Sequence, residues 1–399
     1  MSKKIKKSVP KLRFPDFSDD WNELKFSELI KLTSGQHLLP NEYSLSSDEI
    51  PYFTGPSDFT NDVSELTKWT RFSEKTAQKG DILITVKGNG VGEMLFLHLP
   101  CVAMGRQLMA IRPIKVVGAI IYQKLFTYKQ QLQALASGNV IPGLSRSDIL
   151  NTKIYLPKRE EQEKIASFLG AIDKRLTELR RKHELLQTYK RGVMQKIFSQ
   201  EVRFKGAIGS AFPDWQEKSL GQVLKPVVRE IDKPSQNYLA VGIRSHMKGT
   251  FQKLESDPNK ISMDKLYVVH YNDLIVNITF AWEGAIAIVP RKDHGGLVSH
   301  RFPTYRIRKE ESSTQFFQYL IKQEKIKYIL GLISPGGAGR NRVLNKKDFL
   351  KLKFSMPCPN EQEKIADFLT AIDQKIEAVA RQVDRTEQFK KGLLQKMFV

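Results

Sequence analysis

The side chains with the clearest chemical potential are cations and amides that stand on or near glycine-rich loops. Arginine, lysine, asparagine, glutamine and serine are the residue types that bind phosphate oxygens and read base edges in nucleic acids. Any single one could equally be a solvated surface group, but as groups they favour a polyanionic ligand. The candidates are Lys87, Asn89, Arg106, Gln107, Asn139 and Arg146 in the first half of the chain, and Arg244, Ser245, His246, Asn277, Arg301, Arg340, Asn341 and Arg342 in the second.

Patterns typical of catalysis or metal binding are weak in comparison. No Walker phosphate loop occurs, and after GNGVG at 88–92 the residue Glu93 replaces the glycine of a dinucleotide-binding turn. Pro15-Asp16 and Glu23-Leu24-Lys25 resemble the PD…ExK pattern of metal-dependent nucleases, but the related Pro213-Asp214 lacks the ExK part. The histidines and the two cysteines have no metal-ligand spacing. We therefore predict no catalytic residues and no metal site.

The charge balance supports a polyanionic partner. The chain has 64 Lys and Arg residues against 43 Asp and Glu, a formal net charge of +21. Residues 1–200 carry 31 basic and 21 acidic side chains, and residues 201–399 carry 33 and 22. Because the excess is shared almost equally, we expect two comparable basic surfaces rather than one basic tail.

Length and hydrophobicity limit the class of protein. A chain of 399 residues with 41% hydrophobic residues predicts two or three globular domains. No apolar run approaches the length of a membrane-spanning helix, and no apolar stretch follows the basic start as in a secretory signal. We expect a cytoplasmic protein with no membrane partner.

An internal repeat dominates the sequence. Residues 157–198 and 357–398 align without a gap at an offset of 200 and share 18 identities over 42 positions, including the run EQEKIA at 161–166 and 361–366. Such a repeat implies two copies of one structural unit. Paired glutamates near the start of each copy are explained by a favourable interaction with a helix dipole.

Each copy predicts one long helix with a heptad seam, because apolar residues recur at alternating steps of four and three. An antiparallel coiled coil of the two helices is expected. Polar residues at 183, 190, 386 and 390 interrupt the seams and are expected to fix the register. The seam residues assigned to this contact are Ile165, Leu169, Ile172, Leu176 and Leu179, and Ile365, Leu369, Ile372, Ile376 and Val379.

The segments before the helices are related only weakly. Both open with Phe-Pro and a tryptophan, at 14–21 and 212–215, and both carry an apolar strand that starts with an aspartate, Asp81 or Asp273. FAWEG at 280–284 has no glycine loop like GNGVG. Short strands with few helical runs favour mixed α/β domains with antiparallel sheet. The predicted parts are a domain at 1–156, a helix at 157–199, a domain at 200–356 and a helix at 357–399.

The duplicated EQEKIA…FL…AID helix, each copy following a domain that opens with Phe-Pro and Trp, resembles the specificity subunits of type I restriction-modification systems. The resemblance covers essentially the whole chain. It implies two target-recognition domains that each read half of a split, asymmetric DNA site, and two helices that space them and dock the methyltransferase subunits. It also implies that the partner methyltransferase and restriction subunits use S-adenosylmethionine, ATP and magnesium, and that this chain binds none of them.

Two other interpretations were open from the sequence. The Asn/Asp-Pro-Pro-aromatic tetrad of adenine methyltransferases is missing, which argues against methyl transfer by this chain, and a nuclease would need a motif that does not occur. A non-specific architectural coiled-coil DNA-binding protein would explain the charge and the helices. It would not explain two divergent domains before two similar helices.

Overall fold

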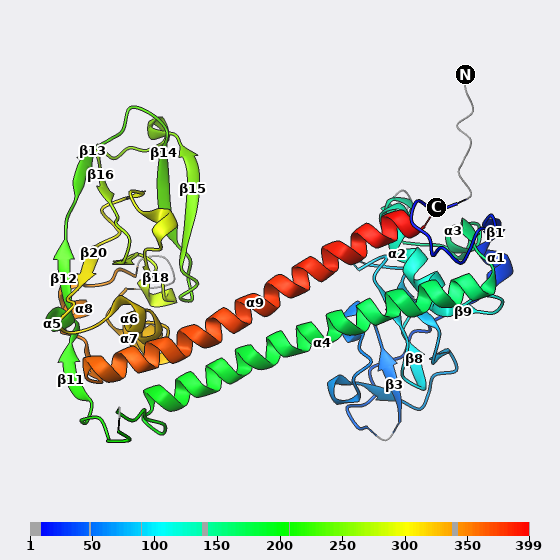
Figure 1. The fold of residues 1–399 in the computed structure, drawn as a ribbon, viewed down its shortest axis with the longest axis horizontal. Helices are drawn as coiled ribbons and strands as arrows, with labels where there is room; N and C mark the ends of the chain where they lie inside the picture. Colours follow the sequence, from blue (N-terminus) through cyan, green and yellow to red (C-terminus); the bar gives the residue numbers. More distant parts are fainter. Residues whose placement is uncertain are drawn as a thin grey trace. The chain divides into compact units, whose positions relative to one another are not determined.

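The computed structural model describes residues 9–47, 49–88, 90–137, 143–206, 208–336 and 342–398. The chain divides into two compact units, unit 1 (Met1–Lys182 and Val379–Val399) and unit 2 (His183–Ala378). Each unit combines a sheet-rich domain with part of each long helix, α4 (Arg159–Phe198) and α9 (Pro359–Met397) (Figure 1). None of the helices in the described ranges has the length and apolar character needed to cross a membrane.

Unit 1 is built mainly of short strands with one longer helix, α2, before the start of α4. Its strands are β1 (Asn22–Lys25), β2 (Ile30–Ser34), β3 (Ile50–Phe53), β4 (Trp69–Thr70), β5 (Thr76–Gln78), β6 (Ile82–Thr85), β7 (Met94–Phe96), β8 (Cys101–Met104), β9 (Leu108–Pro113) and β10 (Lys153–Leu156). Its other helices are α1 (Phe26–Leu29), α2 (Gly118–Ser137), α3 (Arg146–Leu150) and the 3-10 turns η1 (Pro56–Asp58) and η2 (Val63–Glu65).

Unit 2 follows a similar order but has two shorter helices, α6 and α7, where unit 1 has α2. Its strands are β11 (Gln216–Ser219), β12 (Leu224–Val227), β13 (Glu230–Asp232), β14 (Tyr238–Ile243), β15 (Thr250–Ser256), β16 (Lys265–Val268), β17 (Asp273–Val276), β18 (Ile286–Ile288), β19 (Leu297–Val298), β20 (Thr304–Ile307) and β21 (Lys353–Met356). Its other helices are α5 (Leu220–Val223), α6 (Thr314–Leu320), α7 (Glu324–Leu332), α8 (Lys346–Lys351) and the 3-10 turns η3 (Pro258–Lys260), η4 (Ala281–Glu283) and η5 (Arg291–Asp293).

The two units share one sheet topology in spite of their weak sequence relation. An antiparallel sheet has the order β2-β9-β6-β7 in unit 1 and β12-β20-β17-β18 in unit 2. A second sheet has the order β4-β3-β8-β5, matched by β15-β14-β19-β16 with β13 added, and its inner strands β3–β8 and β14–β19 pair in parallel. The expected mixed α/β class is confirmed.

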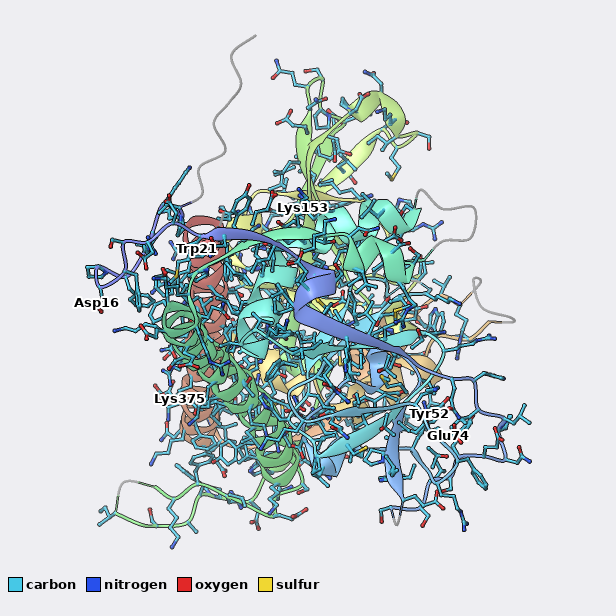
Figure 2. The ribbon with its side chains drawn as sticks, turned by 90° about the vertical axis from the view of Figure 1, so that its right-hand side faces the viewer. Asp16, Trp21, Tyr52, Glu74, Lys153 and Lys375 are labelled. Carbon is cyan, nitrogen blue, oxygen red and sulfur yellow. The ribbon has the colours of Figure 1, made fainter. Side chains whose placement is uncertain are left out.

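A two-stranded sheet completes each unit. It consists of β1 with β10 in unit 1 and of β11 with β21 in unit 2, and both pairs are antiparallel. Figure 2 labels Trp21 and Lys153 at the β1–β10 pair and Tyr52 on β3 of the second sheet. The last strand before each long helix therefore returns to the start of its own domain.

The aspartate at the start of each central strand has a structural role. Asp81 is buried, and its carboxylate accepts from the Gln78 backbone N–H at 2.8 Å and from Arg112 at 2.7 Å. Asp273 accepts in the same way from the His270 backbone N–H at 2.8 Å and from Arg229 at 2.7 Å. These contacts satisfy a buried charge at the turn that begins the strand.

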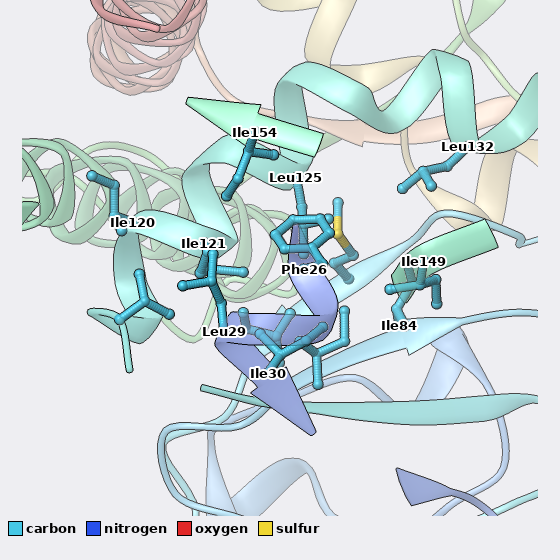
Figure 3. Packing of buried hydrophobic residues seen from close by; sticks show 14 of the residues in the cluster. Phe26, Leu29, Ile30, Ile84, Ile120, Ile121, Leu125, Leu132, Ile149 and Ile154 are labelled. Atoms are coloured by element: carbon cyan, nitrogen blue, oxygen red, sulfur yellow. The ribbon is translucent and has the colours of Figure 1, made fainter. Parts of the chain in front are cut away.

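The domain cores extend onto the long helices. In unit 1, Phe26 and Leu29 of α1 lie among Ile121 and Leu125 of α2 and Ile154 of β10 (Figure 3). The same cluster takes in Ile165 and Leu169 of α4 and Leu393 and Met397 of α9. In unit 2 the corresponding cluster joins Ile197 of α4 to Ile365, Leu369 and Ile372 of α9. In each unit the start of one helix therefore meets the end of the other, as in an antiparallel pair.

The ten seam residues predicted from the sequence are buried, except for Ile172 and Ile376, which are half-buried.

The two long helices begin two residues later than Pro157 and Pro357, at which the sequence placed their starts. The Pro157 and Pro357 carbonyls instead accept from the side-chain amides of Gln162 and Gln362, both at 2.9 Å. The glutamine of the EQEKIA run therefore closes the turn that leads from domain to helix.

A buried arginine–glutamate contact, missed in the sequence, fastens each domain to its helix. Arg13 donates to both carboxylate oxygens of Glu161 at 2.7 Å, and Arg203 donates to those of Glu361 at 3.1 and 2.8 Å. Both glutamates are buried, and Trp215 also donates to Glu361. Hydrogen bonds to these carboxylates raise the pKa of both arginines. The helix dipole alone therefore does not account for these glutamates.

Replacing Arg203 with alanine should destabilise unit 2, because the side chain of Glu361 is 0% exposed and would keep its charge without an ionic partner. We expect a loss of about 3–5 kcal/mol in the free energy of unfolding, measured by urea titration followed by circular dichroism. Arg180→Ala is the matched control, because Arg180 and Glu387 are 63% and 44% exposed. That control should lose less than about 0.5 kcal/mol. Equal losses in the two variants would contradict a special role for the buried contact.

Candidate nucleic-acid interface

Three loops of unit 1 are held side by side by backbone hydrogen bonds. They are the β6–β7 loop at 86–93, the β8–β9 turn at 105–107 and the segment at 143–146 that leads into α3. The Val86 N–H donates to the Gln107 carbonyl, and the Leu144 N–H donates to the Val86 carbonyl, both at 2.8 Å. The loops that carry most of the predicted contact residues therefore form one surface on the same edge of the domain.

Glycines allow these backbones to come close together. A Cβ atom on Gly35 would lie 2.2 Å from the Gly105 carbonyl oxygen, and one on Gly90 would lie 2.5 Å from Pro56. Neither position has room for a side chain. Glycine is thus required at positions 35 and 90 by the close approach of the neighbouring segments.

Unit 2 builds the same arrangement from different residues. The Ile278 N–H donates to the Arg301 carbonyl at 3.0 Å, and the Leu344 N–H donates to the Ile278 carbonyl at 2.9 Å. Ile278 therefore occupies the place of Val86, and Arg301 occupies the place of Gln107.

The missing glycine loop in FAWEG does not change where the loop begins and ends. The segments at 86–92 and 278–284 both run from this equivalent residue to a glycine with positive φ, 84° at Gly92 and 79° at Gly284. The two loops have equal length and end in the same left-handed conformation. The equivalence of the two loops is not visible in the sequence, because the segments share only their last glycine.

The predicted residues of unit 1 that the structure describes are exposed on this surface. Lys87 lies on the β6–β7 loop, and Arg106 and Gln107 form the β8–β9 turn. Arg146 stands at the start of α3 and donates to the Leu32 carbonyl at 3.1 Å and to Ser34 Oγ at 3.3 Å. Asn89 and Asn139 lie outside the described residues.

In unit 2 the surface contains Asn277 and Arg301. Arg301 is exposed and donates to Thr279 Oγ1 at 3.1 Å, while Asn277 accepts from the Thr279 backbone N–H at 3.1 Å. Arg342 donates to the carbonyls of Ser334 and Gly331 and stacks over the Trp282 ring at 5.4 Å, so part of its hydrogen-bonding capacity serves the fold. Arg340 and Asn341 lie outside the described residues.

The β14–β15 turn joins the surface of unit 2. Arg244 donates to the Thr250 carbonyl across this turn, and Ser245 donates to Glu283 at 2.5 Å. The backbone N–H of His246 donates to the Glu283 carbonyl at 2.7 Å. His246 and Met247 have φ values of 59° and 56°, an uncommon backbone conformation for residues other than glycine. The turn is thus fixed against the 278–284 loop, with the His246 side chain exposed.

Two further exposed basic residues lie on these loops and were not predicted from the sequence. His300 precedes Arg301 as Arg106 precedes Gln107, and Lys346 begins α8 as Arg146 begins α3. The offset of 200 could have identified Lys346. His300 could not be found in this way because no sequence similarity aligns the two turns.

The residues that resemble a nuclease pattern are engaged elsewhere. Asp16 accepts from Lys164 at 3.2 Å, and Glu23 accepts from Lys153 at 2.9 Å and from the Tyr155 hydroxyl at 3.0 Å. Within the described ranges, no three His, Cys, Asp or Glu side chains cluster as metal ligands would. The geometry here suits binding by hydrogen bonds and charge.

Comparison with known proteins agrees with this geometry. The family described as the type I restriction modification DNA specificity domain matches residues 18–187 and 213–385. The MjaVIII specificity subunit of a type I restriction enzyme from Methanocaldococcus jannaschii is 23% identical, over 97% of this chain and 93% of that protein. The putative MjaX specificity subunit of the same organism is 27% identical over 63% of this chain and 59% of its own length.

Solved structures show the same fold. The crystal structure of a type I restriction-modification S subunit from M. genitalium superposes with a TM-score of 0.64 at 19% identity, covering 98% of this chain and 99% of that one. A chain from a structure of type I R-M complex assembly and conformational transition has a TM-score of 0.52 at 18% identity, covering 94% and 96%. The matched domains define a class of DNA specificity proteins. This chain belongs to the type I restriction-modification DNA specificity family.

Gln107→Ala should relax the preference at one base position of a DNA target, because a glutamine amide can form two hydrogen bonds with one base edge, one as donor and one as acceptor. We expect the preference for that base to fall by about tenfold to a hundredfold. Lys87→Ala should instead weaken binding to all sequences alike and lower the salt-dependence slope by about one, as expected for a phosphate contact. The measurement is the affinity for a target duplex and its single-base variants at several salt concentrations. Lys375→Ala, an exposed lysine on α9, is the control that should change neither quantity.

Proposed function

We propose that this chain is the DNA sequence-specificity subunit of a type I restriction-modification complex. Each sheet-rich domain reads one half of a bipartite, asymmetric DNA site. The paired helices α4 and α9 set the spacing of the two halves and dock the methyltransferase subunits.

One observation supports this assignment above the others. The same loop framework is built twice, but equivalent positions carry different side chains: Lys87 corresponds to Thr279 and Gln107 to Arg301. A framework with constant backbone and different reading residues suits two unlike DNA half-sites. A symmetric chain would be expected to read a palindrome instead.

The charge distribution supports the same ligand. A net charge of +21, shared between the two halves of the chain, favours a duplex that contacts both domains. Non-specific attraction to phosphates would supply part of the affinity, and the loop side chains would supply the selectivity. A non-specific architectural role would use only the first of these contributions.

The reaction chemistry is assigned to partner subunits. Methyl transfer would use S-adenosylmethionine on the methyltransferase subunits, and cleavage would use ATP and magnesium on the restriction subunits. In this proposal the chain contributes no catalytic residue and selects where the partners act. The repeated helix sequences offer one recurrent surface for the methyltransferase, while the domains vary.

The test is to co-express the chain with the methyltransferase subunit from a neighbouring gene in a host free of DNA methylation and to map modified adenines across the genome. We expect one split, asymmetric motif with a fixed gap. Replacing residues 200–350 by the corresponding segment of another family member should change one half of the motif and leave the other half intact. The parental chain is the matched control.

Two outcomes would count against the proposal. A stable complex with an active methyltransferase but no sequence-restricted modification would favour the architectural role, with sequence-independent binding and a steep salt dependence. Cleavage of DNA by the purified chain with magnesium alone would favour a nuclease.

A further inference from the structure

A single carboxylate in unit 1 joins three segments of the chain. Asp173 of α4 accepts through Oδ1 from Lys390 Nζ of α9 at 2.5 Å, and through Oδ2 from Gln123 Nε2 of α2 at 2.5 Å. The contact therefore links one long helix both to the other helix and to the recognition domain.

Unit 2 repeats this contact at the offset of 200. Asp373 of α9 accepts through Oδ1 from Lys190 Nζ of α4 at 2.5 Å, and through Oδ2 from the Tyr319 hydroxyl of α6 at 2.9 Å. Burial raises the pKa of Tyr319, so its hydroxyl remains a donor over the physiological range. The donor from the domain is an amide in unit 1 and a phenol in unit 2, but in both units it donates to Oδ2 while the lysine donates to Oδ1.

The lysines of these contacts are largely withdrawn from water. The side chains of Lys190 and Lys390 are 17% and 13% exposed. Lys190 also lies 5.3 Å from the Tyr319 ring centroid, and Lys390 lies 5.0 Å from that of Phe126. A lysine with so little solvent needs its carboxylate, because an unpaired charge in such a place is costly.

Away from the domain cores, the rest of the seam specifies the register poorly. Its other positions are mostly leucine, isoleucine and valine, which fit one another after a shift of one seam step. Such a shift would put Thr386 or Leu393 in the place of Lys390, and Leu186 or Val193 in the place of Lys190. Both aspartates would lose their cations together. The penalty for a slipped register thus falls at two places at once.

We propose that Asp173–Lys390 and Asp373–Lys190 are positioning residues that lock the register of α4 against α9 and thereby fix the length of the gap between the two DNA half-sites. This inference rests on the proposed function. A shift of one helical turn, about 5.4 Å, exceeds the roughly 3.4 Å rise of one base pair, so a slipped register would alter the preferred gap.

The experiment removes the lock without weakening the helix pair. The variant carries Lys190→Met, Lys390→Met, Asp173→Asn and Asp373→Asn, which keeps the side-chain volumes and an acceptor for Gln123 and Tyr319. Replacing buried ion pairs by apolar groups often leaves stability unchanged or raises it. We expect an unchanged or higher melting temperature and the same two half-site sequences.

The gap should nevertheless become mixed. In the genome-wide methylation assay, the fraction of modified sites with a gap other than the parental one should rise about tenfold, which corresponds to about 1.4 kcal/mol of lost discrimination between registers. Arg180→Ala with Glu387→Ala is the control, since it removes an exposed ion pair between the same helices and should leave the gap single.

The outcomes separate this inference from the proposed function. A split motif with a single, unchanged gap in the four-residue variant would overturn the register lock and leave the specificity function standing. A parental chain that directs no split motif would overturn the function itself. For a variant that melts at a lower temperature, Asp173→Asn combined with Asp373→Asn provides the second test, and a single gap there would equally overturn the lock.

Discussion

The structure depends on the burial of two helices that could not be stable alone. α4 has 40 residues and α9 has 39, far more than an average globular helix, and both carry many charged residues. Each helix obtains its stability by placing its first turns in one domain core and its last turns in the other unit's core. The domains and the helices therefore cannot be treated as independent modules, since each core is completed by both helices.

This constraint explains why the repeated segment is so similar in its two copies. The buried glutamate of EQEKIA binds an arginine from the start of the domain, the glutamine closes the turn after the proline, and the isoleucine and alanine enter the core. Glu161 and Gln162 have polar partners that a substitution would leave unsatisfied, and Ile165 and Ala166 fill buried space. The similarity between the copies follows from these contacts without any appeal to chemistry on DNA.

Local patterns predicted what depends on local physics. The heptads at 165–179 and 365–379 indicated the long helices, and the strands led by Asp81 and Asp273 were recognisable from a polar residue before an apolar run. Contacts between distant residues were invisible. Arg13 and Glu161 are 148 positions apart, and nothing in their neighbourhoods marks them as partners. The equivalence of Gln107 and Arg301 likewise arises from backbone pairing, which leaves no common residue types behind.

The same backbone pairing accounts for how one framework can present different surfaces. The loops at 86–93, 105–107 and 143–146 are joined to one another through main-chain N–H and carbonyl groups. Such bonds place few demands on the side chains, except where a glycine is needed for close approach or positive φ. Lys87, Arg106 and Gln107 can therefore be exchanged without loss of the bonds that hold their loops. The side-chain contacts that join the helices to the domain and to each other, Glu161 with Arg13 and Asp173 with Lys390, lie instead at the helices. Because the contacts that hold the fold are separate from the loop side chains proposed to contact DNA, those side chains can differ while the architecture remains.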